Sequence, residues 1–305
     1  MYFLSGKLSC WLVVLSLIHT ALALPVISSD EVDLSSTAVS LDDDAELSSN
    51  NLHERAGSFY LRILPLGGSI TVGWGSSTGN GYRKPLRDQL RRDGWKVNMV
   101  GTKIGATNAP KTGTAMLDNS VEAVAGDVVS QIGGADVLQK SLYLLPNVVL
   151  INAGTNDCTK NVDIPNIGTR MNSMLDTIFN KIPGTTVILS TLLPSLDASV
   201  ASCHDNVNAQ YRSLVSARRA KGQKIVIAEL ANVPSTYWNK KLGGDYYDVT
   251  HPTDSGHAKL AAIWYKAINT AYANGFLTPP GGGASPNPNY DDPNTFTTKA
   301  LPAAP

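Results

Sequence analysis

Apolar residues along the chain fall into two alternating patterns, short continuous runs and longer stripes at helical spacing. The runs are typical of strands covered on both faces, and they occupy residues 59–65, 96–100, 147–152, 186–191 and 225–228. The stripes predict helices and lie within residues 82–90, 164–178, 200–219 and 253–272. Strands separated by helices of this length form right-handed βαβ units, so the pattern predicts an α/β fold with a central parallel sheet.

The first 23 residues have the three parts of a secretory signal peptide. Lys7 supplies the basic start, residues 11–18 form an apolar core, and Ala21-Leu22-Ala23 is a cleavage site of the A-x-A type. The apolar run is too short to span a bilayer. We therefore expect a secreted, extracellular protein without a stable membrane anchor, and a retained signal anchor is the alternative.

Two further segments lack the pattern of a folded domain. Residues 24–56 are rich in Ser, Asp and Glu and contain no aromatic residue, which predicts an acidic propeptide or a disordered arm. Residues 278–305 are rich in Pro, Gly and Asn, which predicts a disordered tail. Residues 57–277 remain, and their number suits one domain with one core.

Charge and cysteine content limit the partners and the compartment. The chain has 25 Lys and Arg against 25 Asp and Glu, and no basic stripe predicts a nucleic-acid partner. We expect a monomer that acts on a neutral or weakly charged substrate. Cys158 and Cys203 are the two cysteines outside the signal peptide, and in an exported chain we expect them to form a disulfide. Two buried free thiols are the alternative.

Polar residues follow three of the predicted strands. In a parallel sheet, ligands bind beyond the carboxyl ends of the strands, so residues in these loops are expected to converge at one edge. The residues concerned are Ser69 after the first strand, Asn152, Asn156 and Asp157 after the 147–152 strand, and Asp248 and His251 after the last strand.

A serine becomes a strong nucleophile when an oriented base removes its proton. Outside the first 56 residues the chain has three histidines, His204, His251 and His257, and His251 lies three residues after Asp248. That spacing lets a turn place the Asp248 carboxylate beside the imidazole, which leaves the other ring nitrogen free for Ser69. We expect His204 at the surface and His257 at the start of a helix.

The same chemistry needs donors for a developing oxyanion. Asn156 offers a side-chain amide at the sheet edge, and Gly126 offers a backbone N–H that no side chain obstructs. Trp74, Tyr246 and Tyr247 lie next to the site loops in the sequence, where they would either stack on a sugar ring or pack in the core.

These residues resemble the SGNH (GDSL-type) hydrolases. The resemblance rests on four blocks in order, GGSI at 67–70, VEAVAG at 121–126, GTND at 154–157 and DVTHP at 248–252. It implies a flavodoxin-like three-layer α/β/α sandwich. It also implies a triad of Ser69, Asp248 and His251, with oxyanion donors from the N–H groups of Ser69 and Gly126 and the amide of Asn156.

Within this family, the chain looks most like the secreted microbial carbohydrate esterase family 3 enzymes of the acetylxylan esterase type. This likeness rests on the short length of the domain and on the segment GNGYR at 79–83. Two positions depart from the family pattern. Gly68 stands where the family motif has Asp, and the second block has Glu122-Ala123-Val124 in place of its frequent His.

Other site types are disfavoured by the sequence. The glycines from Gly73 to Gly79 do not have G-x-G-x-x-G spacing, and no Gly-Lys-Ser/Thr follows. A metal site could be sought among Asp248, His251, Asp254 and His257. This set supplies only two imidazoles and does not match the usual ligand sets of metal sites.

The sequence therefore predicts a cofactor-free esterase that acts on acetylated plant polysaccharide through an acyl-enzyme. The alternatives are a short-chain lipase or lysophospholipase of the same fold, and a carbohydrate-binding protein without turnover.

Overall fold

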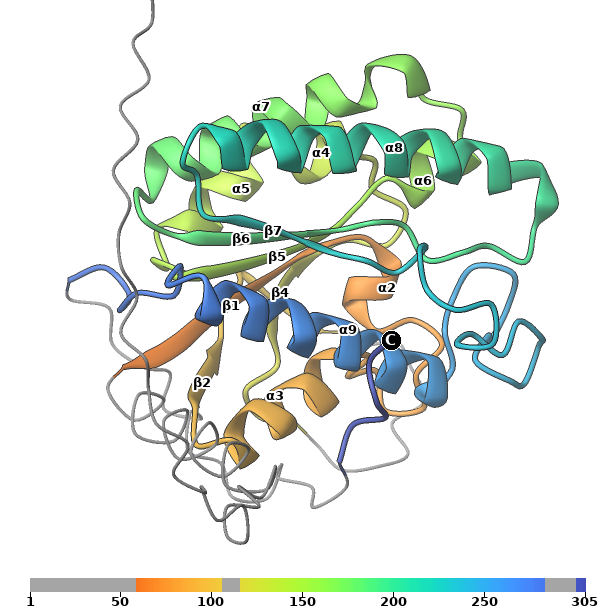
Figure 1. Cartoon of the computed structure of the whole chain (residues 1–305), viewed down its shortest axis with the longest axis horizontal. Coiled ribbons are helices and arrows are strands. Elements are labelled where there is room, and N and C mark those ends of the chain that lie inside the picture. Colours follow the sequence, from red (N-terminus) through yellow and green to blue (C-terminus); the bar gives the residue numbers. More distant parts are fainter. Residues whose placement is uncertain (1–58, 106–115, 283–299) are drawn as a thin grey trace, which may run out of the picture. The chain divides into compact units, whose positions relative to one another are not determined.

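The apolar runs form a central sheet in the computed structural model, which describes residues 59–105, 116–282 and 300–305 (Figure 1). The predicted signal peptide and acidic arm lie outside the described residues. Within the described ranges the sheet has seven strands, which are β1 (Tyr60–Gly67), β2 (Lys96–Met99), β3 (Lys103–Ile104), β4 (Ser120–Ala123), β5 (Val148–Asn152), β6 (Thr186–Ser190) and β7 (Ile225–Ala228).

Strand β1 organises the sheet because it has neighbours on both sides. On one side it pairs with β5, and the parallel order continues through β6 to β7. On the other side its first half pairs with β2 and its last two residues pair with β4, both in parallel. The short β3 adds the antiparallel pair, with β4. The sheet is therefore mostly parallel, as the sequence predicts.

Helices cover both faces of the sheet (Figure 1). One layer contains α3 (Arg83–Arg92) and α9 (Asp254–Ala273). The opposite layer contains α4 (Val129–Ile132), α5 (Ala135–Leu142), α7 (Ile167–Lys181) and α8 (Ala198–Ala220). Three short elements complete the described chain, α2 (Ser69–Val72), α6 (Thr155–Thr159) and the 3₁₀ turn η1 (Ile164–Asn166). This is the α/β/α sandwich that the sequence predicts.

The two faces of the sheet have separate hydrophobic cores. Alternate residues of β1 point to opposite faces, so Leu61 and Ile63 belong to the core under α3 and α9, whereas Leu64 and Leu66 belong to the core under α7 and α8. Burial on both faces explains why these strands read as continuous apolar runs.

A disulfide joins Cys158 of α6 to Cys203 of α8, across 45 residues of sequence. At the other end of the chain, residues 300–305 fall in the segment expected to be a disordered tail. In the structure Leu301 packs against the core under α9, and its N–H donates to the side chain of Gln89 at 3.3 Å. Across the ranges the structure describes, no helix combines the length and the apolar character that a membrane span needs.

Candidate active site

Ser69 is the first residue of α2, directly after β1. The chain turns here beside β5, where a Cβ on Gly67 would lie 2.3 Å from the carbonyl oxygen of Asn152. Glycine is therefore required at position 67. The turn brings the Ser69 side chain to the carboxyl edge of the sheet, which is where the sequence predicts the site.

Asp248, His251 and Ser69 form a continuous chain of hydrogen bonds. The Ser69 Oγ lies 2.8 Å from His251 Nε2, and the Asp248 Oδ2 lies 2.7 Å from His251 Nδ1. The carboxylate accepts from Nδ1–H, which leaves Nε2 as the acceptor of the serine proton. The structure thus brings together the three residues that the sequence selects as nucleophile, base and orienting acid.

The turn that carries Asp248 is fixed from two sides. Asp248 Oδ1 accepts the backbone N–H groups of Thr250 at 2.8 Å and His251 at 2.7 Å. The carbonyl of Val249 accepts from Ser195 Oγ at 3.0 Å and from the N–H of Leu196 at 2.8 Å. The segment after β6 therefore holds the loop in place.

Electrostatics favour the ionised form of Asp248. Partial burial of the carboxylate acts against ionisation, but the hydrogen bonds from the His251 side chain and from the backbone of His251 and Thr250 outweigh it. Together they hold the pKa of Asp248 below its usual range.

Asn156 points from α6 toward the nucleophile turn. Its Nδ2 donates one proton to the carbonyl oxygen of Asp127 at 2.9 Å, and an amide nitrogen carries a second proton. A Cβ on Gly68 would lie 3.1 Å from this nitrogen, which shows how closely α6 approaches the residue before Ser69. Gly126 lies in the same loop as Asp127 and has a φ of +88°, a conformation that favours glycine.

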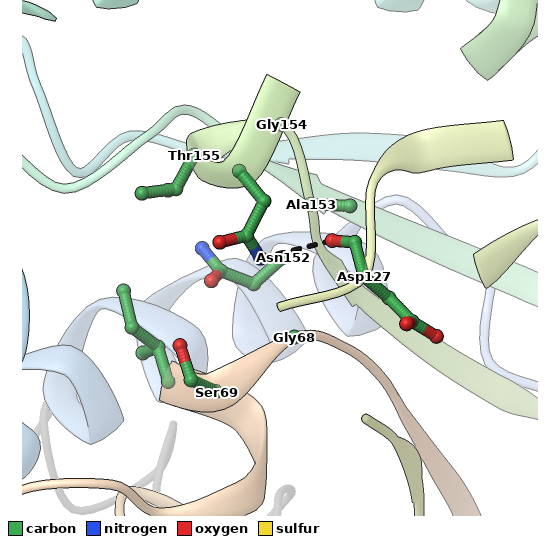
Figure 2. Close-up of a pocket in the computed structure, with 9 residues that line it drawn as sticks. Gly68, Ser69, Asp127, Asn152, Ala153, Gly154 and Thr155 are labelled. Carbon is green, nitrogen blue, oxygen red and sulfur yellow. Dashed lines mark hydrogen bonds between the residues drawn. The ribbon is translucent and has the colours of Figure 1, made fainter. Parts of the chain in front are cut away.

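A small pocket of about 10 Å³ lies beside Ser69, roughly the space that one water molecule needs. It is lined by residues 68–70, residues 152–156 and Asp127. Figure 2 shows the Asp127 carbonyl directed into this pocket while its carboxylate points away. Gly126, which the sequence predicts as an oxyanion donor, does not line the pocket, although the next residue, Asp127, does.

The three aromatic residues considered for substrate contact have different positions. Trp74 is 44% exposed, and its ring centroid lies 5.8 Å from that of His251. Tyr247 is 61% exposed in the loop before Asp248. Tyr246 does not fit the substrate-lining interpretation, because its side chain is fully buried and its hydroxyl donates to the carbonyl of Pro194 at 2.6 Å.

The other two histidines of the domain, His204 and His257, are buried and form hydrogen bonds to backbone carbonyls. His257 Nε2 donates to the carbonyl of Trp74 at 2.9 Å, and burial lowers the pKa of His257 to about 4. The expectation of a surface position for His204 is wrong, since it is 4% exposed and its Nδ1 contacts the carbonyl of Leu193 at 3.1 Å. Burial lowers the pKa of His204 as well.

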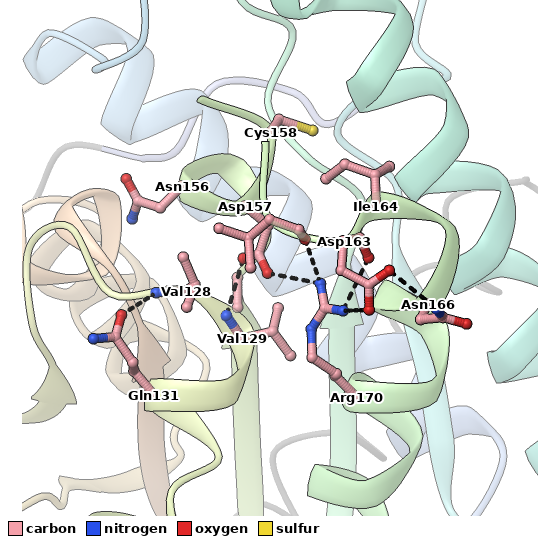
Figure 3. A network of polar contacts seen from close by, with 12 residues as sticks. Val128, Val129, Gln131, Asn156, Asp157, Cys158, Asp163, Ile164, Asn166 and Arg170 are labelled. Atoms are coloured by element: carbon pink, nitrogen blue, oxygen red, sulfur yellow. Dashed lines mark hydrogen bonds and ion pairs between the residues drawn. The ribbon is translucent and has the colours of Figure 1, made fainter. Parts of the chain in front are cut away.

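Two charged residues behind the site were not recognised as a pair in the sequence. Asp157 is fully buried and accepts the N–H of Val129 at 2.9 Å, and Arg170 lies 3.1 Å from its other carboxylate oxygen (Figure 3). In the sequence Asp157 stands out for its place after a strand and as the last residue of the GTND block, and Arg170 occupies a polar position in a helical stripe. Their contact joins a residue of α6 to a residue of α7 that lies 13 positions later in the chain, which no local pattern reveals.

Groups of three or more His, Cys, Asp or Glu residues with the geometry of a metal site are absent from the described ranges.

Comparison with known protein families gives a match over most of the described domain. Residues 66–259 match the model of the GDSL-like Lipase/Acylhydrolase family. A search of curated proteins found no match.

Several solved structures share the fold. A Clostridium thermocellum family 3 carbohydrate esterase has a TM-score of 0.57 at 24% identity over 70% of this chain and 98% of that one. A family 3 carbohydrate esterase from Talaromyces cellulolyticus has a TM-score of 0.55 at 20% identity over 70% and 99% of the chains. An acetyl esterase mutant with an acetate ion has a TM-score of 0.56 at 19% identity, with the same coverage.

Proposed function

The chain belongs to the GDSL-like lipase/acylhydrolase family and is a carboxylic ester hydrolase, and we propose that it removes acetyl groups from polysaccharide with Ser69 as its nucleophile. In this proposal His251 is the general base and Asp248 orients it. The observation that carries the proposal is the unbroken path from Asp248 Oδ2 through the His251 ring to Ser69 Oγ, with contacts of 2.7 and 2.8 Å. Both distances are within hydrogen-bond reach, as general-base activation requires.

The reaction follows from this geometry. Ser69 Oγ attacks the ester carbonyl carbon as its proton passes to His251 Nε2, and the ionised Asp248 stabilises the imidazolium. The carbonyl oxygen becomes an oxyanion that accepts from Asn156, Ser69 N–H and Gly126 N–H. His251 then protonates the leaving alcohol, which leaves an acyl-enzyme. Water attacks this ester by the same steps and releases the acid.

The size of the pocket supports a small acyl group. The space beside Ser69 is about 10 Å³. Among the side chains that line it, those of Asn152 and Asn156 are held by hydrogen bonds, and those of Ile70 and Ala153 are buried. A long acyl chain would have to displace them or lie outside the pocket. An acetyl group adds only one methyl to the carbonyl carbon, so it displaces less of this surface than a longer acyl chain does.

The surroundings of the nucleophile support a carbohydrate as the alcohol. Trp74 exposes its ring beside His251, and Tyr247 is an exposed residue that precedes Asp248 in the chain. Aromatic faces combine apolar area with little loss of side-chain entropy on binding. Two of the fold neighbours are described as family 3 carbohydrate esterases, and a third as an acetyl esterase.

Hydrolysis of p-nitrophenyl acetate tests the nucleophile. We expect Ser69→Ala to lose turnover by several orders of magnitude, whereas Ser216→Ala, which changes an exposed serine on α8, keeps the wild-type rate. Equal rates for wild type and Ser69→Ala would refute the proposed nucleophile. Absence of hydrolysis in the wild type would favour a binding protein without turnover.

A second assay tests the substrate class. Release of acetate from acetylated xylan is compared with release of fatty acid from a phospholipid at equal enzyme concentration. We expect acetate release to be the faster by at least tenfold. Faster fatty-acid release would favour a lipase or lysophospholipase.

A further inference from the structure

Helix α6 and its C-cap residue contact residues 126–129, the segment that leads into α4, at three points. Asn156 Nδ2 donates to the carbonyl of Asp127 at 2.9 Å, and Asp157 Oδ2 accepts the N–H of Val129 at 2.9 Å. Lys160, the C-cap residue of α6, donates from Nζ to the carbonyl of Gly126 at 2.6 Å. The two segments that carry the non-serine oxyanion donors therefore bind each other directly.

These contacts link the two donors through one stretch of backbone. Asp127 O takes one proton of the Asn156 amide, and this bond sets the direction of the second proton. Gly126 has no side chain and a positive φ, so the direction of its N–H depends on the contacts of its own and neighbouring peptide groups. The position of residues 126–127 thus determines where both donors point.

We propose that Lys160 is a positioning residue of the oxyanion hole, whose ammonium group holds residues 126–127 so that the Gly126 N–H and the Asn156 amide face one point. This inference rests on the proposed function. A hydrogen bond from a charged donor is stronger than one between neutral groups. The acceptor here is the carbonyl of Gly126, the residue whose N–H is proposed to bind the oxyanion.

The rest of α6 is anchored well enough to serve as the fixed side of this contact. Asp157 is fully buried and pairs with Arg170 at 3.1 Å, and Arg170 Nη2 also donates to the carbonyl of Val162 at 2.8 Å (Figure 3). Cys158 joins α6 to α8 through the disulfide. In contrast, the two residues that lead into residues 126–129, Val124 and Ala125, are exposed, so we expect Lys160 to restrain this segment rather than the reverse.

The expected effect is on the rate of the chemical step. The oxyanion forms only after the attack by Ser69, so a misplaced donor lowers kcat and leaves KM nearly unchanged. Loss of a whole donor costs roughly a hundredfold or more. Lys160 acts through two donors that keep their other contacts and its side chain is exposed, so we expect a loss of about three- to tenfold.

The experiment compares three variants on p-nitrophenyl acetate. Lys160→Met removes the charge and keeps the length of the side chain, and we expect kcat to fall about three- to tenfold with KM within about twofold of wild type. Lys160→Arg keeps a charged donor, and we expect it to recover most of kcat. Lys181→Met is the matched control, because Lys181 is exposed at the last residue of α7, and we expect wild-type kinetics.

A double variant separates positioning from a general loss of structure. In the Asn156→Ala background one of the two donors that Lys160 controls is already absent, so Lys160→Met should cost a smaller factor than in the wild type. Wild-type kcat in Lys160→Met, or the same full loss in both backgrounds, would overturn the inference. Failure of Ser69→Ala to lower the rate would instead refute the proposed function, so the two failures are distinguishable.

Discussion

At the scale of single residues, Gly68 is the position where the nucleophile motif departs from the family pattern. Its φ of −103° lies outside the left-handed region that favours glycine. Space is the limit, because an added Cβ would lie 3.1 Å from Asn156 Nδ2 and 3.8 Å from the carbonyl of Asp127. A side chain at position 68 would therefore press on the contact that orients the amide.

Gly68→Ala should lower kcat without unfolding the protein. The Asn156 amide must shift by a few tenths of an ångström to admit the methyl group, and this shift weakens its 2.9 Å bond to Asp127. We expect a loss of roughly tenfold in kcat and a change in unfolding free energy within about 1 kcal/mol. Steady-state kinetics and thermal melting measure both quantities. Unchanged or raised kcat would show that the amide can move without cost.

Asp248→Asn should remove most of the activity while the site keeps its shape. A neutral amide neither fixes the tautomer of His251 nor stabilises the imidazolium, and loss of this carboxylate in a serine triad costs on the order of 10⁴-fold in kcat. We expect at least a hundredfold loss on p-nitrophenyl acetate with a Tm close to wild type. A loss below tenfold would show that His251 does not depend on Asp248.

The sequence predicts the reactive residues better than the residues around them. Ser69, Asp248, His251 and Asn156 could be selected because each follows a strand at the edge where ligands bind, and the structure places them together. The sequence leaves Tyr246 open because a tyrosine fits a core and a surface equally well, and its burial depends on the segment after β6.

At the scale of elements, the strands that could be predicted are those with both faces covered. Strands β5, β6 and β7 agree with the apolar runs because burial on both faces makes every position apolar. Strand β4 was missed, since its sequence includes Ser120 and the buried Glu122, whose charge is satisfied by Thr102, Lys103 and Ser141. Helices α2 and α6 have four and five residues, too few for a periodic stripe.

Removal of the disulfide should loosen α6. The bond closes a separation of 45 residues, for which the loop-entropy relation gives about 4 kcal/mol of stabilisation. We expect the Cys158→Ser/Cys203→Ser double variant to melt at a lower temperature and to lose kcat below its own Tm, because α6 also carries Asn156. Addition of reductant should lower the Tm of wild type and leave that of the double variant unchanged. Equal Tm values would contradict a stabilising role.

At the scale of the whole molecule, the N-terminal segment and the disulfide both point to the same cellular compartment. The features of residues 1–23 and a disulfide between the two remaining cysteines both suit an oxidising compartment, and we propose that the protein is secreted. Expression of the full chain in a secreting eukaryotic host should give protein in the medium that begins at Leu24, or later if the acidic arm is also removed. N-terminal sequencing measures this, and a secreted chain that retains Met1 would contradict cleavage.

The stability of the whole molecule should fall as the pH decreases below about 6.5, and His257 supplies a measurable part of the change. Burial lowers the pKa of His257 to about 4 from its usual 6.5, so between these values the unfolded chain binds a proton that the folded protein does not. Unfolding free energy therefore decreases with falling pH, by at most about 1.4 kcal/mol per unit from this group. His204, whose pKa is also lowered by burial, adds a change of the same sign.

His257→Gln isolates the contribution of His257. Glutamine does not titrate, and its Nε2 can donate to the carbonyl of Trp74 as the imidazole does. Other titrating groups are present in both proteins, so the difference between the two curves of unfolding free energy against pH reports His257 alone. We expect urea unfolding between about pH 4 and 7.5 to show a shallower acid loss in the variant. Parallel curves would mean that His257 binds its proton equally well in the folded and unfolded states.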